Sequence, residues 1–261
     1  MRFENTEVWG FQHAIRGMRN PMNSWDKSDS YWSLSEDGSP INPCDEPFLF
    51  IGKSDLSLMQ KLIRAGSEHR KFMRQIFVSV DITAPLYWWK EMDTYKIGTT
   101  ANSTSTMHKL ASSPITLECF EIDDYDRSLT FEEGFYSQGD VAAPYHTIVN
   151  EVVGNNETNY ANSHTLIGFL EALRKRYNET KDKRIWKELV RWLPESWLQT
   201  RTVTMNYENL YTIYHQRKNH KLNEWSGINN KNIPNFISWI ESLPYAKELI
   251  IDTQREMNDK N

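Results

Sequence analysis

The chain of 261 residues has only two cysteines, Cys44 and Cys119, and no run near eighteen apolar residues. Two cysteines are too few for a disulfide framework or a complete zinc site. The missing apolar run argues against a membrane-spanning helix. The first residues, MRFENTEVWG, also lack the apolar core of a signal peptide. These absences predict a reduced cytoplasmic protein with no membrane partner.

The chain also has no excess of positive charge, because 30 Lys and Arg stand against 35 Asp and Glu, for a net charge of −5. A broad nucleic-acid-binding surface is therefore not expected, although a local basic pocket is compatible with this balance. No linker-like stretch divides the sequence. We therefore expect a single domain over 1–261, with a polar and acidic insertion around 112–162.

The usual catalytic and metal-binding motifs are absent as well. The sequence has no GxSxG, Walker-type, HExxH, CxxC or GxGxxG motif in a usable context, and the carboxylates of residues 112–162 show no metal-ligand spacing. We therefore expect no metal site. If the protein is an enzyme, a bound cofactor is expected to supply the chemistry, while side chains orient the reactants and provide charged groups.

Hydrophobic periodicity predicts both helices and strands. Alternation in IFVSVDI predicts a strand over 75–82 with Ile76, Val78 and Val80 on one face. The basic run RKRYNETKDKR is expected to be a polar turn between two helices. A short strand is expected over 47–51, and apolar spacing predicts helices over 11–19, 54–65, 86–92, 164–178, 183–192, 233–240 and 245–251. The helix over 54–65 would begin at a Ser54 or Asp55 cap and end at Gly66.

The stretch over 193–220, LPESWLQTRTVTMNYENLYTIYHQRKNH, joins a predicted strand to a predicted helix. Alternation over 198–205 indicates the strand, and helical spacing begins after Asn206, which would be the N-cap. Asn206 and Arg217 then project the same way, with His220 close to their line, so the helix could present an amide, a guanidinium and an imidazole to one ligand. The alternative is that Arg217 and His220 decorate a solvated helix end.

Residues 93–109, DTYKIGTTANSTSTMHK, are rich in hydroxyls and small side chains. Such donors, following a buried helix, can bind a phosphate or the edge of a ring. The alternative is a solvated Ser/Thr-rich surface loop. The short helix over 11–19 poses a similar choice, because Arg16 and Arg19 could serve an anionic ligand or simply be solvated.

The order of several short motifs resembles the flavin-dependent thymidylate synthase family, ThyX. The family shows a GHE, a strand leading to AP and a helix, an RHR-x7-S signature, and later an LP, a TVN and an arginine closely followed by a histidine. The similarity covers about 54–110 and 164–225. The matching positions in this sequence are Gly66-Ser67-Glu68, Ala84-Pro85, Leu193-Pro194, Thr204-Met205-Asn206 and Arg217.

The signature itself departs from the family pattern. Thr94, Tyr95 and Lys96 stand at the positions of Arg-His-Arg, Thr104 replaces the serine, and Thr106 replaces a further arginine. Only Lys96 keeps a positive charge and only Thr104 keeps a hydroxyl. Because arginine binds phosphate through paired donors, these changes should weaken anion binding.

The resemblance implies a mixed α/β (α+β) subunit of ThyX-like fold, with a central sheet flanked by helices, assembled as a homotetramer. It implies binding of FAD and of a dUMP-like nucleotide between subunits, with NADPH and methylenetetrahydrofolate as co-substrates if the protein is an active methyltransferase. Its roles carry over to Thr94, Tyr95, Asn206 and His220 for the cofactor, to Lys96, Thr104, Arg191 and Arg217 for the substrate, and to Arg217 also for catalysis.

Three functional hypotheses remain after this comparison. The first is a ThyX-type protein that converts dUMP to dTMP with reduced flavin. The second is an inactive descendant that keeps the fold and binds a nucleotide or a protein partner. The third is a flavin enzyme acting on a different pyrimidine, in which Tyr95 replaces the lost histidine.

Overall fold

The computed structural model describes residues 1–33, 49–105, 109–123, 166–229 and 232–253. Cys44, Thr106 and most of the acidic insertion, from residue 124 onward, lie outside this part of the chain. The chain divides into two compact units, of which unit 1 comprises Met1, Thr83–Met92 and Ser103–Arg201, and unit 2 comprises Arg2–Ile82, Asp93–Asn102 and Thr202–Asn261. The expectation of one domain over 1–261 stays a prediction.

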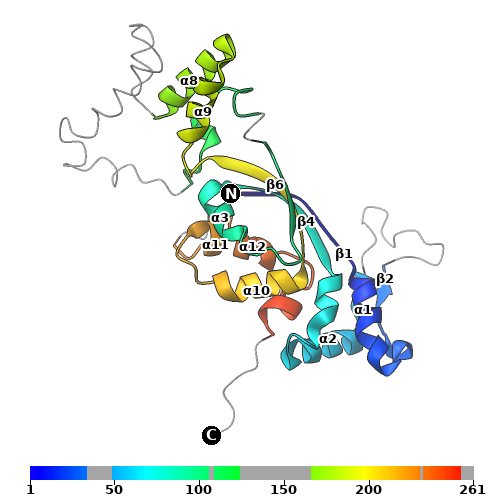
Figure 1. Cartoon of the computed structure of the whole chain (residues 1–261). Coiled ribbons are helices and arrows are strands. Elements are labelled where there is room, and N and C mark those ends of the chain that lie inside the picture. The colour runs from blue at the N-terminus through cyan, green and yellow to red at the C-terminus, as the bar shows by residue number, and fades with distance from the viewer. Residues whose placement is uncertain (34–48, 106–108, 124–165, 230–231, 254–261) are drawn as a thin grey trace. The chain divides into compact units, whose positions relative to one another are not determined.

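A four-stranded sheet with the strand order β1-β4-β6-β5 is the main β-structure (Figure 1). Together with the helices described below it makes the fold mixed α/β, as the sequence predicts. A separate antiparallel pair, β2 with β3, aligns Tyr31 with Phe50 and Trp32 with Leu49. The bounds are β1 Arg2–Trp9, β2 Tyr31–Trp32, β3 Leu49–Phe50, β4 Phe77–Pro85, β5 Thr100–Ser103 and β6 Leu198–Asn206.

The described residues also form eight α-helices and one π-helix, η5. None of the described helices is long and apolar enough to cross a membrane. The bounds are α1 Phe11–Arg19, α2 Lys53–Ala65, α3 Leu86–Met92, α8 Leu166–Thr180, α9 Lys183–Arg191, α10 Tyr207–Arg217, α11 Asn223–Ser226, α12 Phe236–Glu241 and η5 Lys247–Ile251. Four 3-10 turns complete the described elements: η1 Asn20–Met22, η2 Trp25–Lys27, η3 Arg70–Gln75 and η4 Leu117–Cys119.

The predicted strand faces are confirmed by burial. Ile76, Val78 and Val80 are fully buried, and Val203 and Met205 on β6 are buried too. Alternation therefore placed the apolar faces of β4 and β6 correctly, because a period of two puts every second side chain on the core side.

In unit 2, α10 packs against η3, η5 and α12 and buries its apolar stripe. Leu210 and Ile213 are fully buried, and so is the ring of Tyr207, whose hydroxyl donates to the carbonyl of Pro244 at 2.6 Å. Burial raises the pKa of Tyr207 far above its usual value, so this phenol stays protonated. The stripe therefore fixes the orientation of α10 and of the polar residues at its two ends.

In unit 1, α8 and α9 pack side by side (Figure 1). The polar turn expected between them is wrong for most of its length, because α8 continues to Thr180. Lys, Arg and Glu are good helix formers, and a solvated face accepts them. The break comes at Lys181, with a φ of 55°, and at Asp182, whose carboxylate caps α9 by accepting from the Arg184 amide.

Two more expectations need correction, and the edge strand β1 was not predicted. Part of the expected hydroxyl-rich loop forms β5. Helix α2 begins at a Gly52 cap and not at Ser54 or Asp55. The carboxylate of Asp29 accepts from the Ser54 and Asp55 amides at 2.8 and 3.0 Å, so a residue distant in sequence replaces the local cap.

Candidate functional site

The junction of β6 and α10 is fixed by a reciprocal pair of hydrogen bonds. The Asn206 side-chain oxygen accepts from the Asn209 amide at 3.0 Å, and the Asn209 side-chain oxygen accepts from the Asn206 amide at 3.2 Å. This capping box confirms Asn206 as the N-cap. Its amide oxygen is thereby engaged, and its Nδ2 group faces the loop that contains Gly98.

The loop after α3 lies close to this junction. Asn209 Nδ2 donates to the Ile97 carbonyl at 2.7 Å. Gly98 has a φ of +74°, and a Cβ at that position would lie 2.9 Å from Asn206 Nδ2. A side chain at residue 98 would therefore be strained and would press on the Asn206 amide.

A cavity of about 420 Å³ lies between this loop and α10, entirely within unit 2. It brings together four residues that the sequence comparison selected, namely Thr94, Tyr95, Lys96 and Asn206. Its remaining wall comes from Arg74, Ile97, Gly98, Glu208, Asn209 and Thr212. The cavity therefore gathers hydroxyl, amide and cationic groups from three separate segments of the chain.

The cavity carries an excess of positive charge. Its one carboxylate, that of Glu208, accepts from Arg70 Nε at 2.9 and 3.0 Å, and the Arg70 guanidinium lies 4.4 Å from the Tyr211 ring centroid. Among the described residues, Arg74 and Lys96 form no ion pair, and both are exposed. These two cations are thus available to an anionic ligand.

Three of the predicted residues gather around Trp225, which is fully buried. The guanidinium carbon of Arg217 lies 5.0 Å from the Trp225 ring centroid, and the ring centroids of Tyr95 and His220 lie 6.3 and 6.2 Å from it. Arg217 Nε donates to the Tyr95 hydroxyl at 2.8 Å. Tyr95 therefore belongs both to the cavity and to this cluster. The expectation that Arg217 and His220 only decorate a solvated helix end does not fit these contacts.

Two predicted substrate residues belong to unit 1. Thr104 donates its backbone amide to the Thr200 carbonyl at 2.9 Å, and its own carbonyl accepts from Gln199 Nε2 at 3.1 Å. Arg191, near the end of α9, forms an ion pair with Glu188. Their substrate roles stay predictions.

Arg19 is not solvated, which corrects one of the two alternatives drawn from the sequence. Its side chain is 4 % exposed, and Nε lies 2.6 Å from the fully buried Asp55 carboxylate. The hydroxyls of Ser28 and Ser30 donate to the other Asp55 oxygen at 2.7 and 2.6 Å. Arg16, one turn away on α1, is exposed.

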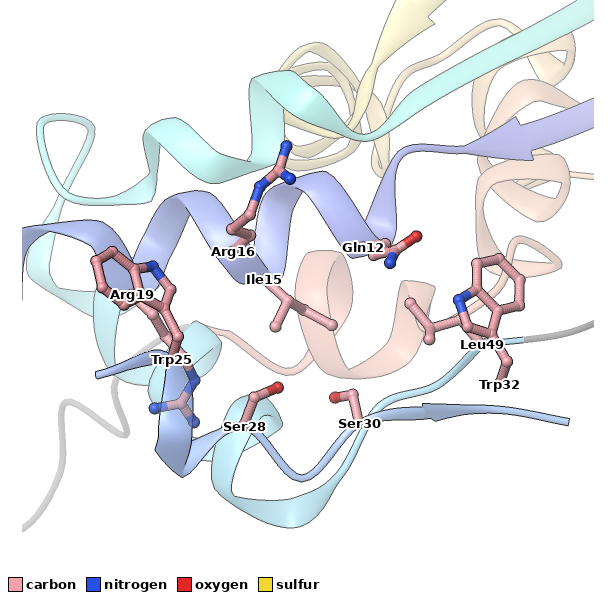
Figure 2. Close-up of a pocket in the computed structure, with 9 residues that line it drawn as sticks. All are labelled: Gln12, Ile15, Arg16, Arg19, Trp25, Ser28, Ser30, Trp32 and Leu49. Atoms are coloured by element: carbon pink, nitrogen blue, oxygen red, sulfur yellow. The ribbon is translucent and has the colours of Figure 1, made fainter. Parts of the chain in front are cut away.

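This network lies beside a smaller cavity of about 270 Å³. In Figure 2, Ile15 points from α1 toward Ser28 and Ser30, and Arg16 extends away from them. Trp25 and Trp32 stand at opposite ends of the cavity. Because the two serine hydroxyls already donate to Asp55, this cavity presents mainly apolar and aromatic surface.

Sequence reasoning missed Arg74, Asn209, Thr212 and Trp225. The spacing of Asn206 and Asn209 is a capping-box spacing, so that signal was present in the sequence. Trp225 gave no signal, because it meets Tyr95 only through the tertiary fold. Among the described residues, no group of His, Cys, Asp and Glu could hold a metal ion.

No protein-family model matches the chain, and no curated protein matches its sequence. Solved structures do match. One is the flavin-dependent thymidylate synthase ThyX from Helicobacter pylori complexed with FAD and dUMP, at 15 % identity and a TM-score of 0.55, covering 98 % of this chain and 100 % of that chain. The fold is ThyX-like. A second structure of the H. pylori ThyX with FAD and dUMP gives the same identity, coverage and TM-score. At this identity the likeness to ThyX establishes the fold alone.

Proposed function

We propose that the protein binds FAD and a uracil nucleotide such as dUMP in a ThyX-type site, to which the cavity of unit 2 contributes one wall. The proposal includes membership of the ThyX family and assembly as a homotetramer. The observation that carries it is that Thr94, Tyr95, Lys96 and Asn206, which stand at the positions of ThyX motif residues, line one cavity.

The chemistry of the cavity fits such ligands. Its volume of about 420 Å³ lies within the range of small-molecule sites, about 300–1,000 Å³. Arg74 and Lys96 suit a phosphate, and the Tyr95 ring suits a planar partner.

The resemblance to ThyX suggests the individual roles. Lys96 and Arg74 would hold the phosphate. The substrate roles of Thr104 and Arg191 rest on the resemblance alone. Asn206 and His220 would hold the flavin together with Thr94 and Tyr95, and Arg217 would contact the pyrimidine as the catalytic residue. When bound, the reduced flavin would supply hydride, with NADPH as its reductant and methylenetetrahydrofolate as the carbon donor.

A second candidate is a ThyX-fold protein that binds a nucleotide without turnover. Two of the three signature residues have lost their charge, and Arg217 donates to Tyr95, which favours this candidate. The third candidate, a flavin enzyme for another pyrimidine, rests on Tyr95 at the histidine position. A turnover assay with dUMP and dCMP separates the three, because only the second predicts no product from either.

Calorimetric titration with dUMP tests the binding proposal. The wild type should bind, and the double variant Arg74→Ala, Lys96→Ala should bind at least tenfold more weakly because both phosphate partners are gone. Lys90→Ala is the matched control, since Lys90 is an exposed lysine paired with Glu195 in unit 1. Equal affinity in the wild type and the double variant would remove the basis for this site.

A further inference from the structure

Tyr95 is the residue that links the cavity to the Trp225 cluster. Its ring lines the cavity together with Lys96 and Asn206. Its hydroxyl reaches the last turn of α10, where it meets Gln216 and Arg217. By the resemblance to ThyX, the residue stands where the signature has histidine.

The directions of its two hydrogen bonds are fixed by chemistry. Arginine can only donate, so the Tyr95 oxygen accepts from Arg217 Nε at 2.8 Å. The single phenolic proton is then donated to Gln216 Oε1 at 3.0 Å. The hydroxyl thus accepts one hydrogen bond and donates another, so the phenol has one defined orientation.

The guanidinium of Arg217 is thereby held by two contacts. Its Nε donates to Tyr95, and its guanidinium carbon lies over the Trp225 ring, 5.0 Å from the centroid. An arginine with a bonded Nε and an aromatic ring beside its guanidinium keeps few of the rotamers that a free arginine would sample. An arginine ordered before the ligand arrives does not lose that freedom on binding.

We propose that Tyr95 is a positioning residue that orders Arg217 for a pyrimidine nucleotide in the adjoining cavity. This inference rests on the proposed function for the identity of the ligand. In this proposal the Tyr95 hydroxyl does not contact the ligand itself and acts only by ordering Arg217.

The first test needs no ligand and uses the Arg217 Nε–H signal in a ¹H–¹⁵N NMR spectrum, assigned by its loss in Arg217→Lys. Tyr95→Phe keeps the ring that meets Trp225 and removes only the hydroxyl. Exchange of the Nε proton with water should then accelerate at least tenfold. Unchanged exchange, with an unchanged melting temperature, overturns the proposal.

The second test is a double-mutant cycle on dUMP affinity. Tyr95→Phe should weaken binding about three- to tenfold in the wild-type background and have no further effect in the Arg217→Lys background. Equal losses in both backgrounds would mean that Tyr95 acts independently of Arg217, which contradicts the proposal. If the wild type fails to bind dUMP, the proposed function fails, and the exchange experiment still decides whether Tyr95 orders Arg217.

Discussion

Arg19 beside one cavity, and Arg74 and Lys96 beside a second cavity of the same compact unit, have opposite surroundings. Beside α1, Arg19 is buried and donates to Asp55, to Ser54 and to the Ser24 carbonyl. Beside α10, Arg74 and Lys96 are exposed and form no ion pair among the described residues. A cation whose partners come from its own chain holds segments together, whereas one that faces a cavity without such partners can serve a ligand.

The difference also explains why motif spacing alone misjudges arginines. Arg16 and Arg19 look equivalent in sequence, three residues apart on one helix, yet only Arg19 is buried. Its partner Asp55 lies 36 residues away. The role of an arginine is therefore decided by which carboxylate the fold brings to it.

The largest effect is expected at Arg19. Arg19→Ala would leave the Asp55 carboxylate buried with serine donors only, so the free energy of unfolding should fall by about 3–5 kcal/mol. Chemical denaturation of the wild type and the variant measures this change in the free energy of unfolding. Arg16→Ala is the matched control and should change stability by less than about 0.5 kcal/mol. A loss below about 1 kcal/mol for Arg19→Ala would mean that the ion pair does not hold α1 to α2.

The next effect is expected at Arg217 and concerns binding more than folding. Arg217→Ala should weaken dUMP affinity roughly a hundredfold, equivalent to about 2.7 kcal/mol, because a charged contact to the ligand is lost. Titration calorimetry and a thermal melt would be run on the same sample. Arg64→Ala, at an exposed arginine of α2, should bind normally. Undiminished binding by Arg217→Ala would count against the assigned role.

Two substitutions of Asn206 distinguish its role as a helix cap from its proposed role in ligand binding. Asn206→Ala should cost about 1 kcal/mol of stability, because the Asn209 amide loses its acceptor. Asn206→Asp keeps that acceptor, and its charge suits a helix N-terminus, so the protein should be at least as stable as the wild type. It should nevertheless bind FAD more weakly, since the amide donor is replaced by a negative charge. Normal FAD binding by Asn206→Asp would assign Asn206 to capping alone.

The smallest effect is a pH dependence at His215. Burial lowers the pKa of His215, and the charges of Lys218 and Arg70 act in the same direction, against a hydrogen bond to the Ile250 carbonyl. The unfolded chain therefore takes up a proton near pH 6.5 that the folded protein binds only at lower pH. Stability should thus fall as the pH drops below about 6.5 and level off below the folded pKa.

Urea denaturation at pH 7.5 and at pH 5.5 tests this linkage by comparing the wild type with His215→Gln. The variant should lose less stability between the two pH values, because it has no imidazole to protonate. The same loss in both proteins would assign the pH dependence to other groups.

The parts that sequence could predict are those set by neighbours along the chain. The change from two-residue alternation to helical spacing at Asn206 is local, and the structure has β6, the N-cap and α10 where that change predicts them. The apolar faces of β4 and α10 follow from the same periodicity. Local signals therefore located one wall of the candidate site.

The remaining parts depend on contacts between distant segments. Asp29 caps α2 from 25 residues away, so Ser54 and Asp55 gave a misleading cap signal. Trp225 contacts Tyr95, Arg217 and His220 only once the chain has folded. β1 was missed because, as an edge strand with mostly exposed side chains, it lacks the apolar alternation that marks a buried face.

The most direct test of the central claim, that the cavity beside α10 belongs to a flavin site, is the visible absorbance spectrum of the purified protein before and after addition of FAD, followed by gel filtration. The account predicts a perturbed flavin spectrum that elutes with the protein. Flavin that elutes entirely at the small-molecule volume, with an unperturbed spectrum, would contradict the claim and leave a ThyX-like fold without a flavin site.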